Sequence, residues 1–309
     1  MVTAAPNPNL IAFVGDLHGK LAAFEHTTAQ ALNRGATTIV QVGDFWIYDG
    51  PKELPKLQRT LRRICPDGIA VEDIDYRFID GNHENFDVLN PGAAALVQMS
   101  DNVTYMPRGT RAHLAGAAIL FFGGASSTDR EHRIEGKDWW PAENITTGQA
   151  ERVTAADPAD TSDSSRVDIL VTHDTSTTAF TDLCTVSPHA RGKQHDPAGE
   201  TNRAHLDSIV ARARPRFHVH GHHHTRHSCT YDLDGHPVTD ISLSLEKTTG
   251  SVAICDTRDL TWTSPVGRQD TGDDEKLPIP GREPETTACA EHDTQPPTAT
   301  TPPRTHPPC

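Results

Sequence analysis

The chain has 309 residues, which suits one large domain or two small ones. Its formal net charge of −14 argues against a general nucleic-acid-binding surface, which would need a basic patch. A phosphate substrate is still compatible with this charge, because metal ions can supply positive charge locally. The six cysteines form no CxxC pair, a pattern that favours reduced thiols in a cytoplasmic protein over a zinc ribbon or a disulfide framework.

The sequence shows no sign of a membrane segment. Residues 1–9 have neither the basic region nor the apolar stretch that begins a signal peptide. No apolar run approaches the roughly 20 residues that a transmembrane helix needs. We therefore expect a cytoplasmic protein with no membrane partner.

The first 80 residues alternate between strand and helix patterns. Short apolar or β-branched runs that end at turn signals predict buried strands at Ile11–Val14, Thr37–Val42 and Tyr76–Ile79. Apolar residues at helical spacing predict helices over residues 21–32 and 54–64. Strand, helix and strand at this spacing predict parallel pairs joined by right-handed crossovers.

Polar residues follow each of these predicted strands. They are Asp16 and His18 after the first strand, Asp44 after the second, and Asn82 and His83 after the third. Ligands of open α/β sheets bind outside the carboxyl ends of the strands. We therefore expect these side chains to share one site.

Residues 103–122 predict three short strands with no helix between them, which favours antiparallel pairing and a second sheet. These strands are Val103–Tyr105, Arg111–Leu114 and Ala118–Phe122. A long polar loop follows, in which Arg130 and Arg133 could clamp a phosphate substrate, although an ordinary exposed basic loop also explains them. Trp139–Trp140 is expected to pack the loop onto the domain rather than stack on a ligand. Thr146 and Gln149 match a capping box that opens a short helix.

Two further buried strands are predicted in the second half of the chain, at Val167–Val171 and Phe217–Val219. His173 follows the first of them. His222 and His224, within a cluster of five histidines between positions 220 and 227, follow the second. These histidines extend the series of polar residues at strand ends.

The segments around these strands have weaker patterns. Residues 206–213 predict a helix, whereas residues 188–200 are rich in Gly, Pro and His and predict a mobile loop. Asp234-Gly235 signals a hairpin within a run of antiparallel strands over residues 230–263.

The composition changes from Pro265 onward, where 10 of the chain's 23 prolines occur with many threonines and no sustained apolar pattern. Residues 265–309 are therefore predicted to be a disordered tail. Residues 1–264 are predicted to form a single domain of the α/β (α+β) class, whose two halves form a pair of sheets.

Eight polar residues gather at the predicted strand ends. They are Asp16, His18, Asp44, Asn82, His83, His173, His222 and His224. Seven of them could bind two divalent ions about 3.5–4 Å apart if one carboxylate bridges the pair. Mixed Asp, Asn and His ligation suits Mn, Fe, Co, Ni or Zn, whereas Mg or Ca would use less imidazole and a structural zinc site would prefer cysteine.

Five short motifs occur in order, each after a predicted strand. They are Asp16-Leu17-His18, Gly43-Asp44, Gly81-Asn82-His83-Glu84, Thr172-His173 and Gly221-His222-His223-His224. This series resembles the calcineurin-like metallophosphoesterase superfamily over residues 11–224. The resemblance implies two mixed β-sheets packed as a sandwich and flanked by helices, a four-layer αββα fold. Because the run after Gly43-Asp44 lacks the second Asp and the Arg-Gly of the protein Ser/Thr phosphatases, the chain resembles bacterial or phage-type members instead.

The same resemblance implies a role for each motif residue. One ion would be held by Asp16, His18, Asp44 and His224. The other would be held by Asp44, Asn82, His173 and His222. Asp44 would bridge the two ions, and His83 would protonate the leaving oxygen or stabilise charge on the phosphoryl group. The partner of His83 is left open between Asp49 and Glu84.

The predicted function is a dinuclear metal-dependent phosphoesterase with two divalent ions per chain, with Mn as the first candidate. A metal-bridging hydroxide would attack the phosphorus of a small phosphate mono- or diester in line. The alternative is a catalytically silent member of the fold that serves as a metal-binding or interaction module. The acidic surface argues against stable binding of long nucleic acid. Substrate, native metal and oligomeric state are left open at this point.

Overall fold

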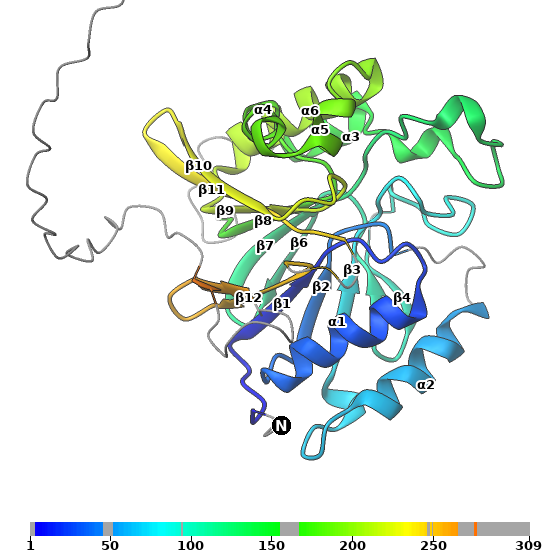
Figure 1. The fold of residues 1–309 in the computed structure, drawn as a ribbon, viewed down its shortest axis with the longest axis vertical. Coiled ribbons are helices and arrows are strands. Elements are labelled where there is room, and N and C mark those ends of the chain that lie inside the picture. Colours follow the sequence, from blue (N-terminus) through cyan, green and yellow to red (C-terminus); the bar gives the residue numbers. More distant parts are fainter. Residues whose placement is uncertain are drawn as a thin grey trace, which may run out of the picture.

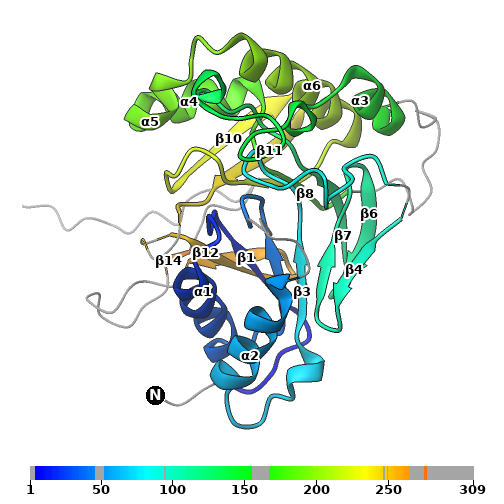
Figure 2. The same ribbon diagram turned by 90° about the vertical axis from the view of Figure 1, so that its right-hand side faces the viewer.

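Two β-sheets pack face to face between two layers of helices (Figures 1 and 2). This architecture confirms the predicted α/β sandwich of four layers. The computed structural model describes residues 4–45, 52–93, 95–154, 167–245, 248, 250–264 and 275–276.

The first sheet has the strand order β14-β13-β12-β1-β2-β3-β5-β4. Its strands are β1 (Leu10–Val14), β2 (Thr38–Gln41), β3 (Asp75–Phe78), β4 (Val97–Ser100), β5 (Val103–Tyr105), β12 (Val252–Asp256), β13 (Thr261–Ser264) and β14 (Glu275–Lys276). Strands β1, β2, β3 and β5 are parallel, as the strand–helix–strand pattern predicted for the first three. β12 pairs with β1 in the antiparallel sense.

The second sheet has the order β10-β11-β9-β8-β7-β6. Its strands are β6 (Thr110–Leu114), β7 (Ala117–Phe122), β8 (Ile169–Thr172), β9 (Phe217–His220), β10 (His227–Leu233) and β11 (His236–Ser242). The central strands β7, β8, β9 and β11 are parallel, and β6 and β10 close the two edges in the antiparallel sense. The expected antiparallel run over residues 230–263 is therefore divided between the two sheets.

The helices form the two outer layers. They are α1 (Leu21–Asn33), α2 (Leu54–Ile64), α3 (Thr147–Thr154), α4 (Thr177–Val186), α5 (Pro188–Gly192) and α6 (Pro197–Ala213). Helices α1 and α2 cover the first sheet, and α3 to α6 lie over the second (Figure 1). Short 3₁₀ turns occur at Val71–Asp73, Arg130–His132 and Pro141–Glu143.

Burial on both faces explains the unbroken apolar runs of the central strands. In β1, Ile11 and Phe13 belong to the core between the sheets, whereas Ala12 and Val14 belong to the core beneath the first helical layer. Parallel strands covered on both faces have near-continuous apolar sequences for this reason. Because both faces of the sheets are buried, polar side chains can gather at the carboxyl ends of the strands instead.

Residues 188–200 correct the expectation of a mobile loop, because they form α5 and the first turn of α6. The side chains of Ser187 and Asp196 cap these helices by accepting hydrogen bonds from the backbone N–H groups of Ala190 and Gly199. A proline follows each cap at the first helical position, where its missing N–H costs nothing.

Two local predictions are confirmed by their hydrogen bonds or backbone angles. Thr146 N–H donates to Gln149 Oε1 and Gln149 N–H donates to Thr146 Oγ1, as a capping box requires. Asp234 and Gly235 both have positive φ, at 50° and 76°, as in the tight turn of a β-hairpin.

Only Glu275–Lys276, which form β14, are described in the predicted tail, so disorder of residues 265–309 stays a prediction. Among the described residues, no helix has the length and apolar character that a membrane span requires.

Candidate metal centre

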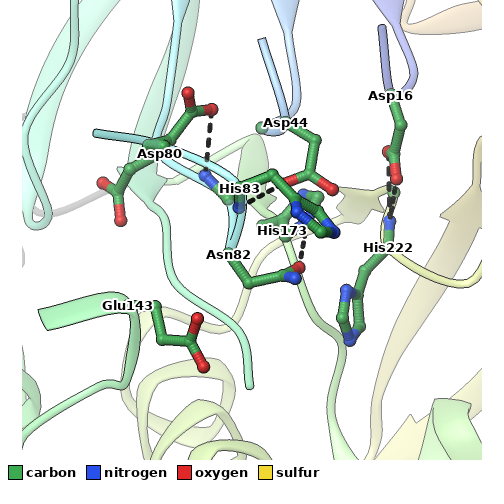
Figure 3. A network of polar contacts seen from close by, with 12 residues as sticks. Asp16, Asp44, Asp80, Asn82, His83, Glu143, His173 and His222 are labelled. Carbon is green, nitrogen blue, oxygen red and sulfur yellow. Dashed lines mark hydrogen bonds and ion pairs between the residues drawn. The ribbon is translucent and has the colours of Figure 1, made fainter. Parts of the chain in front are cut away.

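The predicted ligands lie at one edge of the sandwich, where strands of both sheets end (Figure 3). Asp16, Asp44 and Asn82 follow β1, β2 and β3 of the first sheet. His173 follows β8 and His222 follows β9 of the second sheet. The site is therefore shared by the two sheets, and each sheet contributes through the carboxyl ends of its parallel strands.

Four of the predicted ligands adopt left-handed backbone conformations. The φ angles are 46° at His18, 57° at Asp44, 61° at His222 and 52° at His224. Residues with a Cβ rarely adopt positive φ, and such strain concentrates at functional sites. The strand-end loops thus hold these side chains in place at an energetic cost that the surrounding packing must offset.

Two glycines allow the loops to pass close to the carboxylates. A Cβ at Gly81 would collide with the Asp44 side chain and backbone, and a Cβ at Gly221 would collide with Asp16. The glycines that precede Asn82 and His222 in the sequence motifs are therefore required by close approach to the carboxylates.

One group of ligand atoms converges tightly. Donor atoms of Asp16, His18, Asp44 and His224 all lie within 4.8 Å of one another. His224 Nε2 is 3.1 Å from Asp16 Oδ2 and 3.0 Å from His18 Nε2. Two carboxylates and two imidazoles in this arrangement fit a divalent transition-metal ion. They are the four ligands that the family resemblance implied for the first ion.

The second predicted ligand group is assembled in part. His173 Nε2 lies 3.3 Å from both Asp44 Oδ1 and Asn82 Oδ1. His173 Nδ1 is 2.8 Å from the Val42 carbonyl oxygen, which can only accept, so Nδ1 carries a proton and a metal would bind at Nε2, in place of the proton that faces Asp44 there. The ring of His222 lies 5.1 Å from that of His173, centre to centre.

Lys193 is a neighbour of His222 that the sequence analysis did not single out. Its Nζ donates to the His222 carbonyl oxygen at 2.8 Å and lies 3.2 Å from His222 Nε2. Burial lowers the pKa of Lys193 to about 8. Lys193 directly follows α5, so its contact with His222 could be found only from the path of the chain after that helix.

The two aspartates stay ionised although they are buried. Burial by itself would raise the pKa of Asp44, but the charge of His173 and a hydrogen bond from it hold the pKa well below its ordinary value. Burial by itself would lower the pKa of His173, but Asp44 beside it raises that pKa to about 10. Ionised carboxylates in a buried site create a negative potential that a divalent cation would neutralise.

His83 lies beside the predicted ligands and contacts both Asp44 and Arg133. Its backbone N–H donates to Asp44 Oδ1 at 2.9 Å, and Arg133 Nη1 lies 2.8 Å from its Nδ1. Because a guanidinium offers only donors, Nδ1 of a neutral His83 must accept and its proton must be on Nε2. Burial, assisted by the charge of Arg133, lowers the pKa of His83 to about 4. His83 is therefore a neutral Nε2–H donor next to the ligands.

The structure separates the two arginines of the expected phosphate clamp. Arg133 reaches His83 and is oriented by two hydrogen bonds to the Asp129 carboxylate, at 2.8 and 2.9 Å. Arg130 turns instead toward the first turn of α6, where it pairs with Asp196 at 3.0 Å. Only Arg133 is brought into contact with a predicted site residue.

The two suggested partners of His83 have different outcomes. Glu84 accepts hydrogen bonds from the backbone N–H groups of Phe45 and Gly81, and it thereby braces the ends of β2 and β3. Asp49 lies outside the described residues. Arg133 is the partner that the structure supplies.

The histidines of the 220–227 cluster that lie outside the ligand set contact aspartates. His223 pairs with Asp174 at 2.9 Å, and His220 pairs with Asp240 at 2.9 Å. His227 contacts the more exposed Asp182 at 2.6 Å. These contacts agree with the structural role expected for histidines that the Gly-His-x-His motif does not use.

Arg108 and Asp80 form a buried ion pair next to the site, which the sequence did not predict. Arg108 donates two hydrogen bonds to Asp80 Oδ2, at 2.9 and 2.7 Å, and both side chains are inaccessible to solvent. Arg108 also donates to the Ala142, Glu143 and Asn144 carbonyl oxygens. It thus ties the polar loop to the end of β3. Asp80 directly precedes the Gly81-Asn82 motif, which is the one signal that could have revealed it.

Fold and site together define a metal-binding protein of the two-sheet sandwich class. The chain matches the family model of calcineurin-like phosphoesterases over residues 10–226, more than half of its length. It therefore belongs to the calcineurin-like phosphoesterase family, as the five motifs predicted. The family places it among metal-dependent phosphoester hydrolases in general.

Solved structures share the fold at low sequence identity. A dimetal phosphatase from Danio rerio is 11% identical, with a TM-score of 0.50, and the match covers 88% of this chain and 100% of that one. The TT1561 protein of Thermus thermophilus is 12% identical, with a TM-score of 0.48 and coverage of 84% and 99%. No protein with a curated description matches the sequence.

Proposed function

We propose that the chain is a dinuclear metal-dependent phosphoesterase that acts on a small phosphate mono- or diester, with Mn²⁺ as the first candidate metal. The observation that carries this proposal is the position of Asp44. Its Oδ2 lies 3.7 Å from His18 Nδ1, and its Oδ1 lies 3.3 Å from His173 Nε2. One oxygen thus faces each ligand group, which suits a carboxylate that bridges two ions.

Each part of the site has a chemical role in this proposal. When bound, the two ions would activate water for in-line attack and neutralise charge on the phosphoryl oxygens. His83 donates its Nε2 proton in a hydrogen bond to the phosphoryl group or the leaving oxygen. Arg133 fixes the tautomer of His83 through Nδ1 and adds a positive charge beside it. That charge favours a monoester dianion over a diester.

The test compares p-nitrophenyl phosphate with bis-p-nitrophenyl phosphate in the presence of Mn, Ni, Co, Zn or Mg. We expect metal-dependent turnover that is faster with the monoester and is lost in Asp44→Asn. Asp240→Asn is a matched control, because this aspartate is also buried and histidine-paired but lies in none of the candidate metal groups of the described residues.

Two results would contradict the proposal. If Asp44→Asn keeps both its metal content and its activity, Asp44 does not bridge the ions. If the protein binds two ions per chain and hydrolyses neither ester, the proposed activity on simple esters fails, which leaves an enzyme of narrow substrate specificity or the catalytically silent module.

A further inference from the structure

The polar loop between β7 and α3 returns to the metal centre at two buried residues. Glu143 has no solvent-accessible surface and Ser127 is 2% exposed. Figure 3 shows the Glu143 carboxylate on the same side of the site as the Asn82 amide. Neither Ser127 nor Glu143 belongs to the family motifs, and neither is a ligand candidate.

These residues form a hydrogen-bonded chain that ends at a predicted ligand. Glu143 Oε1 accepts from the Ser127 backbone N–H, and Glu143 Oε2 accepts from Ser127 Oγ, both at 2.7 Å. Ser127 Oγ in turn accepts from Asn82 Nδ2 at 3.0 Å. The opposite end of the same amide, Asn82 Oδ1, faces His173.

The donors and acceptors available to these three side chains fix the direction of each hydrogen bond between them. An ionised carboxylate can only accept, so both Ser127 donors, the N–H and the O–H, are used by Glu143. Ser127 Oγ then has only lone pairs to offer Asn82, and the amide must present its NH₂ group to Ser127. An amide has one donor end and one acceptor end, so Oδ1 is turned toward the metal centre.

We propose that Ser127 and Glu143 are positioning residues that hold the Asn82 amide with its oxygen toward the second metal ion. This inference rests on the proposed dinuclear site. Without these hydrogen bonds, the Asn82 amide could rotate and present its NH₂ group, which cannot bind a cation. Groups that orient a metal ligand typically change metal affinity by about 10–100-fold when they are removed.

This hydrogen-bonded chain is itself anchored by further hydrogen bonds, which makes the orientation of the Asn82 amide rigid. The Glu143 backbone carbonyl accepts from the Ala125 N–H at 3.2 Å and from Arg108 Nη2 at 2.8 Å. Arg108 is paired with Asp80, two residues before Asn82. Both ends of the hydrogen-bonded chain, Glu143 and Asn82, are therefore fixed to the end of β3.

The first experiment measures Mn²⁺ binding to the metal-free full-length protein by calorimetry. It is performed at about pH 8.5, because burial raises the pKa of Glu143 to about 7 and the carboxylate form is required. In Ser127→Ala we expect one of the two sites to weaken by about 10–100-fold. Ser126→Ala is the matched control, because Ser126 is an equally buried neighbour whose hydroxyl faces Arg130.

A second experiment separates orientation from a general structural effect. In an Asn82→Asp background both side-chain termini are oxygen atoms, so no amide needs to be oriented. There, Ser127→Ala should cause no loss of Mn²⁺ affinity, or a gain, because it removes a lone pair that faces a carboxylate. When Asn82 is unchanged, Glu143→Gln should weaken Mn²⁺ binding, because an amide cannot accept from both Ser127 donors.

Each outcome decides the proposal. Wild-type Mn²⁺ affinity in Ser127→Ala, or an equal loss in the Asn82→Asp background, would overturn it. If Ser127→Ala does not fold, Glu143→Gln gives the same decision through its Mn²⁺ affinity. Because metal binding is the readout, a wild-type protein that binds two ions and hydrolyses nothing would defeat the proposed function and leave the positioning role intact.

Discussion

The contact between Arg133 and His83 places a permanent charge beside the residue expected to touch the phosphoryl group. Arg133→Gln should lower kcat/KM for an aryl phosphate monoester by about 10–100-fold, which corresponds to the loss of one charged hydrogen bond. The loss should be smaller with a diester, which carries one negative charge less. Steady-state kinetics on both esters measure it. Arg130→Gln is the control, and an equal loss there would contradict a specific role for Arg133.

His83 is expected to act on the substrate without binding metal. His83→Ala should lower kcat by about 10²–10⁴-fold, the usual range for a proton donor or acceptor in the transition state. The metal content should stay at the wild-type value, because the donor atoms of the ligand groups are untouched. Kinetics and elemental analysis of the same preparation check this. A parallel loss of metal would make His83 a ligand.

At the scale of elements, α6 depends on its first turn. Asp196 accepts from the Gly199 N–H at 3.0 Å and also pairs with Arg130. Asp196→Ala should cost about 1 kcal/mol and lower Tm by about 2–4 °C, because an N–H at the helix start loses its acceptor. Asp196→Asn keeps the cap and loses only the charge, so its Tm should stay near wild type. Equal Tm losses would assign the effect to the ion pair.

The helix and strand predictions succeeded where the signal was local. The runs Ile11–Val14 and Ala118–Phe122 are apolar without interruption because both faces of their sheets are covered. α5 was missed because a helix of five residues has too few positions for an apolar periodicity, and its start is marked only by Ser187 and the following proline.

At the scale of the whole molecule, the predicted metal ligands come from both sheets. Asp16 and Asp44 come from the first sheet, and His173 and His224 from the second. Each bound ion should therefore stabilise the sandwich by about 2.7 kcal/mol at a metal concentration 100 times its Kd. Thermal denaturation should show a lower Tm after treatment with EDTA and a metal-dependent recovery. Asp44→Asn should show little of either change.

Acid stability should depend on the buried carboxylate of Asp240. Burial by itself would raise its pKa, but the charge of His220 and hydrogen bonds from His218 and His220 hold the pKa well below its ordinary value. A depressed folded-state pKa stabilises the protein above the unfolded value of about 3.9, and this contribution is lost as the pH falls below it.

Asp240→Asn should therefore destabilise the protein by about 3–5 kcal/mol near neutral pH, since it breaks a buried ion pair. The difference from wild type should shrink as the pH falls below about 4, where this carboxylate becomes protonated in the unfolded state and, at lower pH, in the folded state as well. Urea denaturation at several pH values measures this. A difference that does not depend on pH would show that the charge of Asp240 is not the cause.

The sequence by itself determined the family and predicted the ligand set, because each motif follows a strand that is recognisable from its own residues. Parallel strands of one sheet bring their carboxyl ends to one edge, so local patterns were enough to predict that Asp16, Asp44 and Asn82 share a site. Only the tertiary structure decided what surrounds them. Arg133 reaches His83 across 50 positions, and Ser127 reaches Asn82 across 45. Those contacts depend on the path of a polar loop with no periodicity, which buried hydrogen bonds hold in place.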